Sequence, residues 1–268
     1  MRFTKMQGIG NDYVYVNLFE ETVEDAPALA RKLSRRRFGV GSDGLILIGP
    51  SDRADFRMHM YNADGSRGAM CGNGARCVGK YVHDKGLTEK TELTLETDAG
   101  IRALRLNLEE GHVASVRVDM GEPGFAGGQE LPVEIGGRTF AVTPVSMGNP
   151  HGVTFLQEPV ERFDLGMYGP LMERHPAFPE GINAEFVNVL SRDRLRMRVW
   201  ERGSGVTLAC GTGACAVLAA ACLRGLTQRK ARVELDGGEL TVEWDEATGH
   251  VFMTGPAAFV FDGETLEE

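Results

Sequence analysis

The 268-residue sequence has no excess of basic residues, no long uninterrupted apolar run and no closely spaced pairs of cysteines. Its 29 lysine and arginine residues are outnumbered by 38 aspartate and glutamate residues, and the net charge of −9 argues against a general nucleic-acid binder because it repels a polyanion. Residues 203–223 carry no charge, but glycines interrupt them, and the apolar part, 214–223, is too short for a membrane span of about 20 residues. We therefore expect neither nucleic acid nor a membrane as a partner.

Cysteine is scarce and poorly spaced for a metal site or a redox pair. Structural zinc sites use thiols only a few residues apart, whereas Cys71 and Cys77 are six residues apart, Cys210 and Cys215 are five apart, and a C-x-x-C motif is absent. Cys77, Cys215 and Cys222 fall at apolar helical positions, where cysteine behaves as a small hydrophobe. We predict no metal. The odd number of cysteines, with no apolar secretory segment at the N-terminus, favours a reducing cytoplasm.

Glycine, with 35 residues, is unusually frequent and indicates many tight turns or close backbone approaches. The hydrophobic share of 42% and charged share of 25% are ordinary for globular proteins and exclude intrinsic disorder. Residues 39–44 fit the G-x-G-x-x-G pattern, but the apolar segment 45–48 that follows is typical of a strand. A dinucleotide site needs a helix at that point, so the match carries no cofactor prediction.

The sequence contains an internal duplication. At an offset of 139, residues 56–61 align with 195–200, and 71–75 align with 210–214. Three further short matches occur at an offset of 138. Because these offsets are about half the chain length, the pattern predicts two copies of one folding unit.

Each copy has the same predicted order of elements, namely a strand, a glycine-rich turn, a helix and a hairpin. This order predicts an α+β fold of two similar, pseudo-symmetric domains, 1–120 and 121–268, each with a curved, mixed or antiparallel sheet around a central helix. The turn-rich segments 121–124 and 127–128 mark the junction. We expect the first copy's helix to be less completely enclosed, because it keeps charged residues such as Arg76.

Cys71 and Cys210 occupy equivalent positions in the two copies, each directly before a Gly-x-Gly that opens a helix. The unpaired N–H groups and the dipole of a helix N-terminus favour a thiolate and can bind an anion. If the domains face each other across a cleft, one sulfur can remove a proton from one face of a carbon while the other delivers a proton to the opposite face. The pair therefore predicts inversion at a carbon next to a carboxylate, with no obligatory cofactor.

The distinctive motifs lie along essentially the whole chain. They are the segments 8–12, 61–66, 70–77, 147–151, 181–186, 201–203 and 209–213. Together they resemble the diaminopimelate epimerase family. The resemblance implies an isomerase that interconverts LL- and meso-2,6-diaminopimelate without pyridoxal phosphate, on the route to lysine and peptidoglycan. It also implies a homodimer, and two domains that close on the substrate.

The resemblance assigns roles to individual residues. It makes Cys71 and Cys210 the catalytic thiolate and thiol, which exchange roles with reaction direction. The matching substrate-binding residues are Asn11, Asn62, Gly72, Asn73, Asn149, Asn183, Glu201, Arg202, Gly211 and Thr212. His151 and Glu201 match positions that tune the thiol pKa values. Some relatives carry glutamine where this chain has Gly44, so we leave Gly44 outside the site.

Two other functions would also use Cys71 and Cys210. A proline or hydroxyproline racemase would also employ opposed cysteines, but its cyclic substrate offers no second ammonium and carboxylate for Glu201 and Arg202. A non-catalytic thiol or metal module would instead use Cys71 and Cys210 as zinc ligands or as a structural disulfide.

Overall fold

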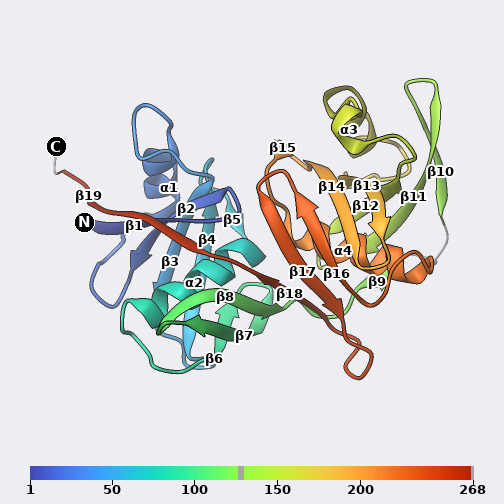
Figure 1. The fold of residues 1–268 in the computed structure, drawn as a ribbon. Coiled ribbons are helices and arrows are strands. Elements are labelled where there is room, and N and C mark those ends of the chain that lie inside the picture. The colour runs from blue at the N-terminus through green and yellow to red at the C-terminus, as the bar shows by residue number, and fades with distance from the viewer. Residues whose placement is uncertain (126–129, 267–268) are drawn as a thin grey trace. The chain divides into compact units, whose positions relative to one another are not determined.

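The computed structural model describes residues 1–125 and 130–266, which form two compact units (Figure 1). Unit 1 consists of Met1–Val118 and Gly255–Glu268, and unit 2 of Asp119–Thr254. Both units combine parallel and antiparallel strand pairs with helices, which confirms the predicted mixed α+β class. Within the described ranges, each helix is too short or too polar to cross a membrane.

Unit 1 is built from a sheet and two helices. Its strands are β1 (Arg2–Gly8), β2 (Asn11–Asn17), β3 (Gly44–Gly49), β4 (Phe56–Asn62), β5 (Arg67–Gly68), β6 (Glu92–Thr97), β7 (Gly100–Glu109), β8 (His112–Asp119) and β19 (Ala258–Glu264), and its helices are α1 (Ala26–Ser34) and α2 (Gly72–Asp84). The pairs β1–β2, β3–β4, β6–β7 and β7–β8 are antiparallel, while β2–β3 and β4–β6 are parallel.

Unit 2 repeats this plan. Its strands are β9 (Gly124–Phe125), β10 (Leu131–Ile135), β11 (Arg138–Ser146), β12 (Pro150–Phe155), β13 (Asn183–Ser191), β14 (Arg194–Glu201), β15 (Gly205–Thr207), β16 (Lys230–Leu235), β17 (Gly238–Trp244) and β18 (Val251–Gly255), and its helices are α3 (Leu165–Glu173), α4 (Gly211–Leu223) and the short 3₁₀ turn η1 (Val160–Arg162). The pairs β11–β12, β13–β14, β16–β17 and β17–β18 are antiparallel, while β12–β13 and β14–β16 are parallel.

The two units therefore share their strand order and pairing directions, which confirms the duplication. The agreement extends to the helices, because α1 moved by 139 residues falls on the bounds of α3, and α2 moved likewise falls on α4. Residues at offsets of 138 or 139 can thus be compared as structural equivalents.

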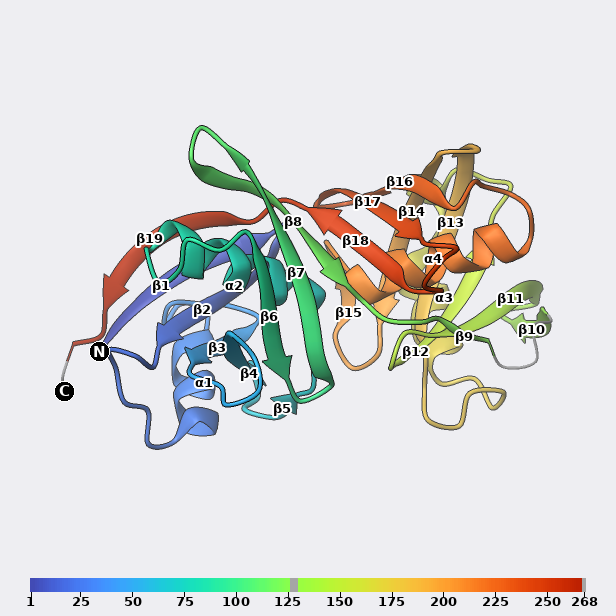
Figure 2. The same ribbon diagram turned by 90° about the horizontal axis from the view of Figure 1, so that it is seen from below.

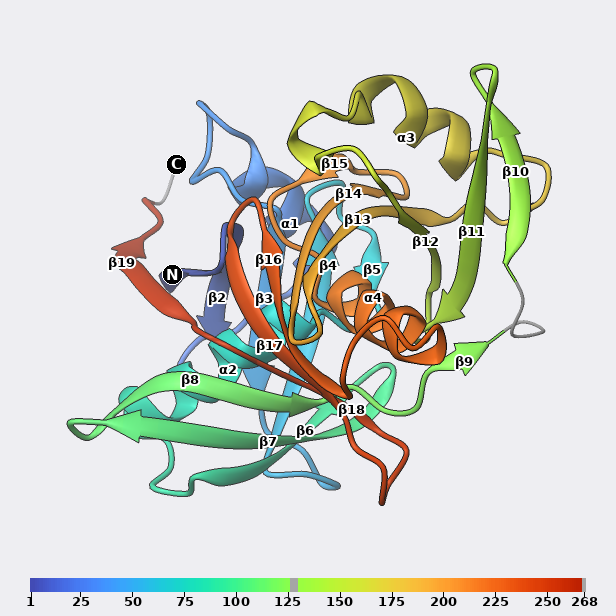
Figure 3. The ribbon, with the colours of Figure 1, turned by 45° about the vertical axis from the view of Figure 1, so that its right-hand side comes forward.

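A central helix packs against the sheet of each unit. Figure 3 shows α4 among the strands of unit 2, and it contacts β11, β12, β13, β14, β16 and β17. Ten of the thirteen residues of α4 are buried, and α2 also buries ten of thirteen. The expectation that charged residues leave α2 less enclosed is therefore wrong. Arg76 is fully buried because Asn73 Oδ1 and the backbone oxygen of Pro256 accept its hydrogen bonds, at 2.9 and 3.0 Å.

The C-terminal segment belongs to the first unit. Strand β19 pairs with β1 in antiparallel register, from Arg2 opposite Glu264 to Gln7 opposite Ala258 (Figures 1 and 2). The predicted second domain, 121–268, is therefore too long at its C-terminal end, because sequence periodicity does not show which sheet edge a last strand joins. The first boundary, at 118/119, lies close to the predicted junction, whose segment 127–128 falls outside the described residues.

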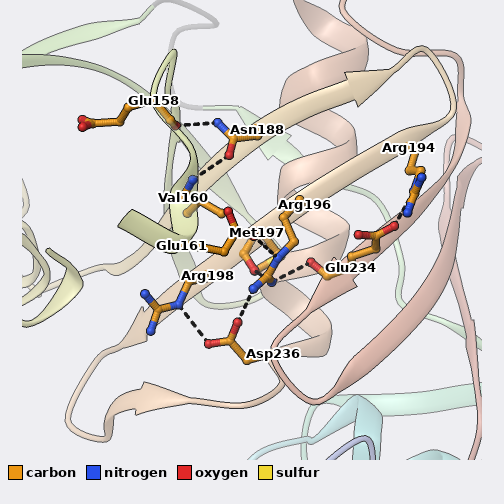
Figure 4. Close-up of polar contacts among 10 residues, drawn as sticks. All are labelled: Glu158, Val160, Glu161, Asn188, Arg194, Arg196, Met197, Arg198, Glu234 and Asp236. Atoms are coloured by element: carbon orange, nitrogen blue, oxygen red, sulfur yellow. Dashed lines mark hydrogen bonds and ion pairs between the residues drawn. The ribbon is translucent and has the colours of Figure 1, made fainter. Parts of the chain in front are cut away.

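Ion pairs reinforce the outer face of β14 in unit 2 (Figure 4). Arg196 binds Glu161 at 2.8 Å and also pairs with Asp236, which in turn accepts a 2.9 Å bond from Arg198. Nearby, Asn188 accepts from the backbone N–H of Val160 at 2.7 Å. These contacts attach η1 to β13 and β14, and the β16–β17 turn to β14; both strands belong to the sheet that packs on α4.

Candidate active site

Cys71 and Cys210 are both the N-cap residues of central helices, as predicted. Their backbones are extended, with φ and ψ of −132° and 117° at Cys71 and −128° and 106° at Cys210. In each case the sulfur accepts a 3.3 Å hydrogen bond from a backbone N–H of the first turn, that of Gly74 or Gly213. The duplication has thus reproduced the same cap geometry twice.

The glycine that bonds each sulfur is required by close packing. A Cβ atom at Gly74 would lie 2.6 Å from Ile46 Cδ1, and one at Gly213 would lie 2.8 Å from Glu185 Oε1. Side-chain atoms essentially never approach so closely, so any larger residue would displace the strand residue beneath the helix start.

In unit 1, amide side chains surround Cys71, which is partly exposed. The Asn11 carbonyl oxygen, Oδ1, accepts hydrogen bonds from Cys71 Sγ at 3.4 Å and from Asn73 Nδ2 at 3.3 Å. Asp43 fixes the orientation of this amide, because its carboxylate accepts from Asn11 Nδ2 at 2.8 Å and from the Asp12 backbone at 3.0 Å. These residues form the Cys71 half-site.

In unit 2, Cys210 is only 4% exposed. The Thr212 hydroxyl lies 3.6 Å from its sulfur and accepts a 3.4 Å bond from Asn149 Nδ2. Asn149 Oδ1 is in turn 3.0 Å from His151 Nε2, and His151 Nδ1 is 2.7 Å from Glu185 Oε1. These residues form the Cys210 half-site.

The carboxylates of Glu201 and Glu185 both act on the buried Cys210 thiol. Burial, followed by the charges of Glu201 and Glu185, raises the pKa of the Cys210 thiol well above its usual value. Hydrogen bonds from Thr212 and Gly213 oppose this rise. The expectation that the helix N-terminus favours the thiolate is therefore not met at Cys210, because burial and two carboxylates outweigh the dipole.

His151 and Glu185 are both fully buried. Burial raises the pKa of the Glu185 carboxyl, and the bond to His151 opposes that rise.

Ligand atoms of His151, Glu185 and Cys210 all lie within 4.8 Å of one another. The 2.7 Å separation between His151 and Glu185 is that of a hydrogen bond, whereas two ligands of tetrahedral zinc, with bonds of about 2.0 Å, would be about 3.3 Å apart. The geometry therefore fits a shared proton better than a metal ion.

Other predicted residues of unit 2 gather at the end of β14. Glu201 accepts a hydrogen bond from the Thr207 hydroxyl. Asn183 is buried and uses both ends of its amide, because Nδ2 donates to the backbone of Pro150 at 2.8 Å and Oδ1 accepts from the Arg202 backbone at 2.9 Å. Asn183 thus holds the Arg202 turn in place.

In unit 1, Asn62 lies at the equivalent end of β4, where its amide donates to the Ser66 hydroxyl at 2.9 Å. The neighbouring Gly44 has no room for a side chain, because a Cβ atom there would lie 2.1 Å from the backbone oxygen of Tyr61.

The other three cysteines lie on the central helices as expected. Cys77 and Cys215 are fully buried, and burial raises the pKa of Cys77 to about 11. Cys222, at the end of α4, donates to the backbone of Gln228 at 3.1 Å. None of the three caps a helix N-terminus.

Asp43 and Glu185 were not selected from the sequence. Glu185 had a readable signal, since it is the only charged residue in the first five residues of β13, an otherwise largely apolar buried stretch. Asp43 had none, because an aspartate in a glycine-rich loop is usually a turn residue.

The fold is shared with solved structures of low sequence identity. A phenazine biosynthesis protein of the PhzF family from Bacillus anthracis matches with a TM-score of 0.76 and 17% identity over 100% of this chain and 99% of its own. A probable proline racemase from Agrobacterium radiobacter matches with a TM-score of 0.76 and 16% identity over 100% and 93%. These likenesses define the fold class, that of two similar domains.

Sequence comparison defines the family. The family model described as diaminopimelate epimerase matches residues 3–126 and 143–260. The chain is 57% identical to the diaminopimelate epimerase of Acetivibrio thermocellus over 98% of both proteins, and 54% identical to that of Agathobacter rectalis over 98% of this chain and 99% of the relative. The chain belongs to the diaminopimelate epimerase family.

Proposed function

We propose that the chain interconverts LL- and meso-2,6-diaminopimelate by direct proton transfer at the α carbon, with Cys71 and Cys210 as the two acid–base groups. Membership of the family makes the chain an isomerase of lysine biosynthesis. The observation that carries the assignment of the two cysteines is their shared geometry, since both sulfurs accept a first-turn N–H at 3.3 Å at equivalent helix starts.

In the proposed reaction the two sulfurs act on opposite faces of the substrate α carbon. One cysteine, as thiolate, accepts the α proton, and the other, as thiol, donates its proton to the opposite face. The reaction returns the enzyme with the proton on the first sulfur, so the two cysteines exchange roles when the direction reverses. Two groups are needed because a single base would mostly return the proton that it removed.

The negative charge that develops next to the substrate carboxylate needs hydrogen-bond donors. The first N–H groups of a helix have no acceptor within the helix, so those of residues 72–73 and 211–212 are suited to bind that carboxylate. One such donor is typically worth about 2.7–4 kcal/mol in the transition state. Asn11 and Asn149, each beside a cysteine-capped helix, would orient the reacting end.

The distal end of diaminopimelate carries a second ammonium and carboxylate. Glu201 and Arg202 offer the complementary charges, and Asn183 accepts a hydrogen bond from the Arg202 backbone. Asn62, the equivalent of Glu201 in unit 1, would add an amide to the recognition of the substrate. A proline or hydroxyproline substrate would leave these charges unused. The relatives above 50% identity are named diaminopimelate epimerases, so the racemase alternative has less support.

The proposal includes a homodimer in the cytoplasm and requires no cofactor, because the two thiols supply both proton transfers. His151 and Glu201 would tune the Cys210 thiol, for which the charge of Glu201 is already a cause of its raised pKa.

Substrate specificity can be tested directly. Purified protein, without added cofactor, is incubated with LL-diaminopimelate, L-proline or trans-4-hydroxy-L-proline, and the stereoisomers are separated by chiral chromatography. We expect conversion of diaminopimelate alone. Racemisation of proline at a comparable rate would contradict the proposed substrate.

A further inference from the structure

The two half-sites differ at one buried position beneath the helix start. Ile46 on β3 and Glu185 on β13 are equivalent at the offset of 139. Each provides the atom nearest to a Cβ built at the glycine that bonds the sulfur, at 2.6 and 2.8 Å respectively. Both side chains are fully buried. An apolar residue therefore satisfies the packing in unit 1, whereas unit 2 keeps a carboxylate in the same place at a considerable desolvation cost.

The carboxylate has a specific partner. Glu185 Oε1 and His151 Nδ1 are 2.7 Å apart, and both residues are inaccessible to solvent. The equivalent of His151 in unit 1 is Tyr13, which with Ile46 cannot form such a pair. A buried carboxylate and imidazole at this distance share one proton, whichever of the two atoms carries it.

The asparagine amide shows the direction of the remaining hydrogen bonds. The carbonyl oxygen of Asn149 lies 3.0 Å from His151 Nε2, so Nε2 carries a proton and donates it, while Nδ1 and Glu185 share a second proton. The amide of Asn149 then donates through Nδ2 to the Thr212 oxygen at 3.4 Å. The single hydroxyl proton of Thr212 is left for the Cys210 sulfur at 3.6 Å.

We infer that Glu185 is a positioning residue, which fixes His151, Asn149 and Thr212 so that a hydroxyl donor is directed at Cys210, and which thereby makes the duplicated half-sites chemically unequal. The inference rests on the proposed role of Cys210 as an acid–base group. In unit 1 the corresponding amide, Asn11, presents its oxygen to the sulfur and acts as an acceptor. Cys71 thus faces a hydrogen-bond acceptor, whereas Cys210 faces a hydrogen-bond donor.

Two substitutions at Glu185 separate positioning from packing. Glu185→Gln keeps a polar partner, because its amide can donate to Nδ1 while His151 retains Nε2–H. Glu185→Ile introduces the residue of unit 1 and leaves Nδ1 without a partner. We expect kcat per folded molecule to fall about 10- to 100-fold in Glu185→Ile, with KM little changed, and less than threefold in Glu185→Gln. Glu96→Gln, which alters another buried carboxylate bonded to Ser51 in unit 1, is the matched control and should leave kcat unchanged.

A double-mutant cycle tests whether Glu185 acts through the chain. Thr212→Val removes the hydroxyl and keeps the backbone N–H. Because Glu185→Ile already misdirects that hydroxyl, the double variant should be no slower than the slower single variant. Multiplication of the two losses would overturn the inference, as would full kcat in Glu185→Ile once the folded fraction is measured.

A readout without substrate keeps this inference separate from the proposed function. In ¹⁵N-histidine NMR spectra of the whole chain, His151 should carry a proton on Nε2 in the wild type and in Glu185→Gln, and a mixture of tautomers in Glu185→Ile. Loss of epimerase activity in the wild type would refute the proposed function and leave these spectra interpretable. An unchanged tautomer in Glu185→Ile, or one equivalent of zinc bound to His151 and Cys210 in protein purified under reducing conditions, would overturn the positioning role.

Discussion

The two half-sites have nearly the same backbone and very different side chains. Each contains a cysteine cap, a glycine whose N–H binds the sulfur, and an asparagine hydrogen-bonded to the second residue of the helix. Among the equivalent positions that differ are Tyr13 and His151, Ile46 and Glu185, Asn62 and Glu201, and Asn73 and Thr212. Both carboxylates that raise the pKa of Cys210 thus have uncharged counterparts in unit 1. The duplication preserved the geometry of the two caps, whereas the carboxylates that raise the pKa of Cys210 are present in unit 2 alone.

Removal of either sulfur should have the largest effect. Cys71→Ala and Cys210→Ala should each lower epimerisation by about 10²- to 10⁴-fold, because general acid–base catalysis contributes about that much. Cys222→Ala, a change of the same chemistry at the far end of α4, is the control and should retain activity. Turnover above a few per cent in either variant would contradict the need for two cysteines.

Substitution of Arg202 tests whether unit 2 recognises the distal end of the substrate. Its equivalent in unit 1 is Ala63, so the duplication offers no second guanidinium at this place. Arg202→Ala should raise KM for diaminopimelate about 10- to 100-fold, since a charge-assisted hydrogen bond is typically worth about 1.5–3 kcal/mol. Arg198→Ala removes an ion pair from β14, the strand that precedes Arg202, and should leave KM unchanged. If Arg202→Ala lowers the melting temperature as strongly as the affinity, Arg202 is structural.

The unequal surroundings of the thiols can be measured by alkylation. Cys71→Ala leaves Cys210 as the one cap cysteine, and Cys210→Ala leaves Cys71, with peptide mapping to distinguish the modified residue from the other three cysteines. Because burial and Glu201 raise the pKa of Cys210, its reaction with iodoacetamide should reach half its maximal rate at a higher pH than a typical thiol. We expect Cys210 to react more slowly than Cys71 at neutral pH, because Cys210 is buried and its pKa is raised, whereas Cys71 is partly exposed. Equal pH profiles would remove the proposed asymmetry.

Alanine at the two cap glycines should have smaller effects, which appear mainly in stability. Gly74→Ala presses on Ile46 and Gly213→Ala on Glu185, and overpacking typically costs about 1–3 kcal/mol. The comparison is informative because Gly213→Ala also displaces the partner of His151 and should lower kcat further than Gly74→Ala does. Denaturant unfolding and steady-state kinetics on the same preparations separate the two effects. Equal kinetic losses would indicate that Glu185 has no part beyond packing.

Sequence reasoning predicted features that repeat along the chain and missed those that depend on distant packing. The duplicated Cys-Gly-x-Gly motif predicted both helix caps, because a glycine-rich turn between a strand and an apolar helix has few other structures. The pairing of β19 with β1, which join opposite ends of the chain, has no local signal. The buried Arg76 was misjudged for the same reason, since its acceptor at Pro256 is 180 residues away. Likewise, the pKa of Cys210 depends on carboxylates from two other strands.

Deuterium labelling at early reaction times tests the use of two separate acid–base groups most directly. LL-Diaminopimelate is incubated with the wild-type protein in heavy water, and the substrate and product pools are analysed by mass spectrometry before a tenth of the substrate has reacted. Because the incoming proton comes from a different sulfur than the one that removes the substrate proton, the new meso-diaminopimelate should carry one deuterium and the remaining LL-diaminopimelate none. Deuterium in the recovered LL-diaminopimelate at a rate comparable to product formation, or unlabelled product, would show that a single group handles both protons and would contradict the account.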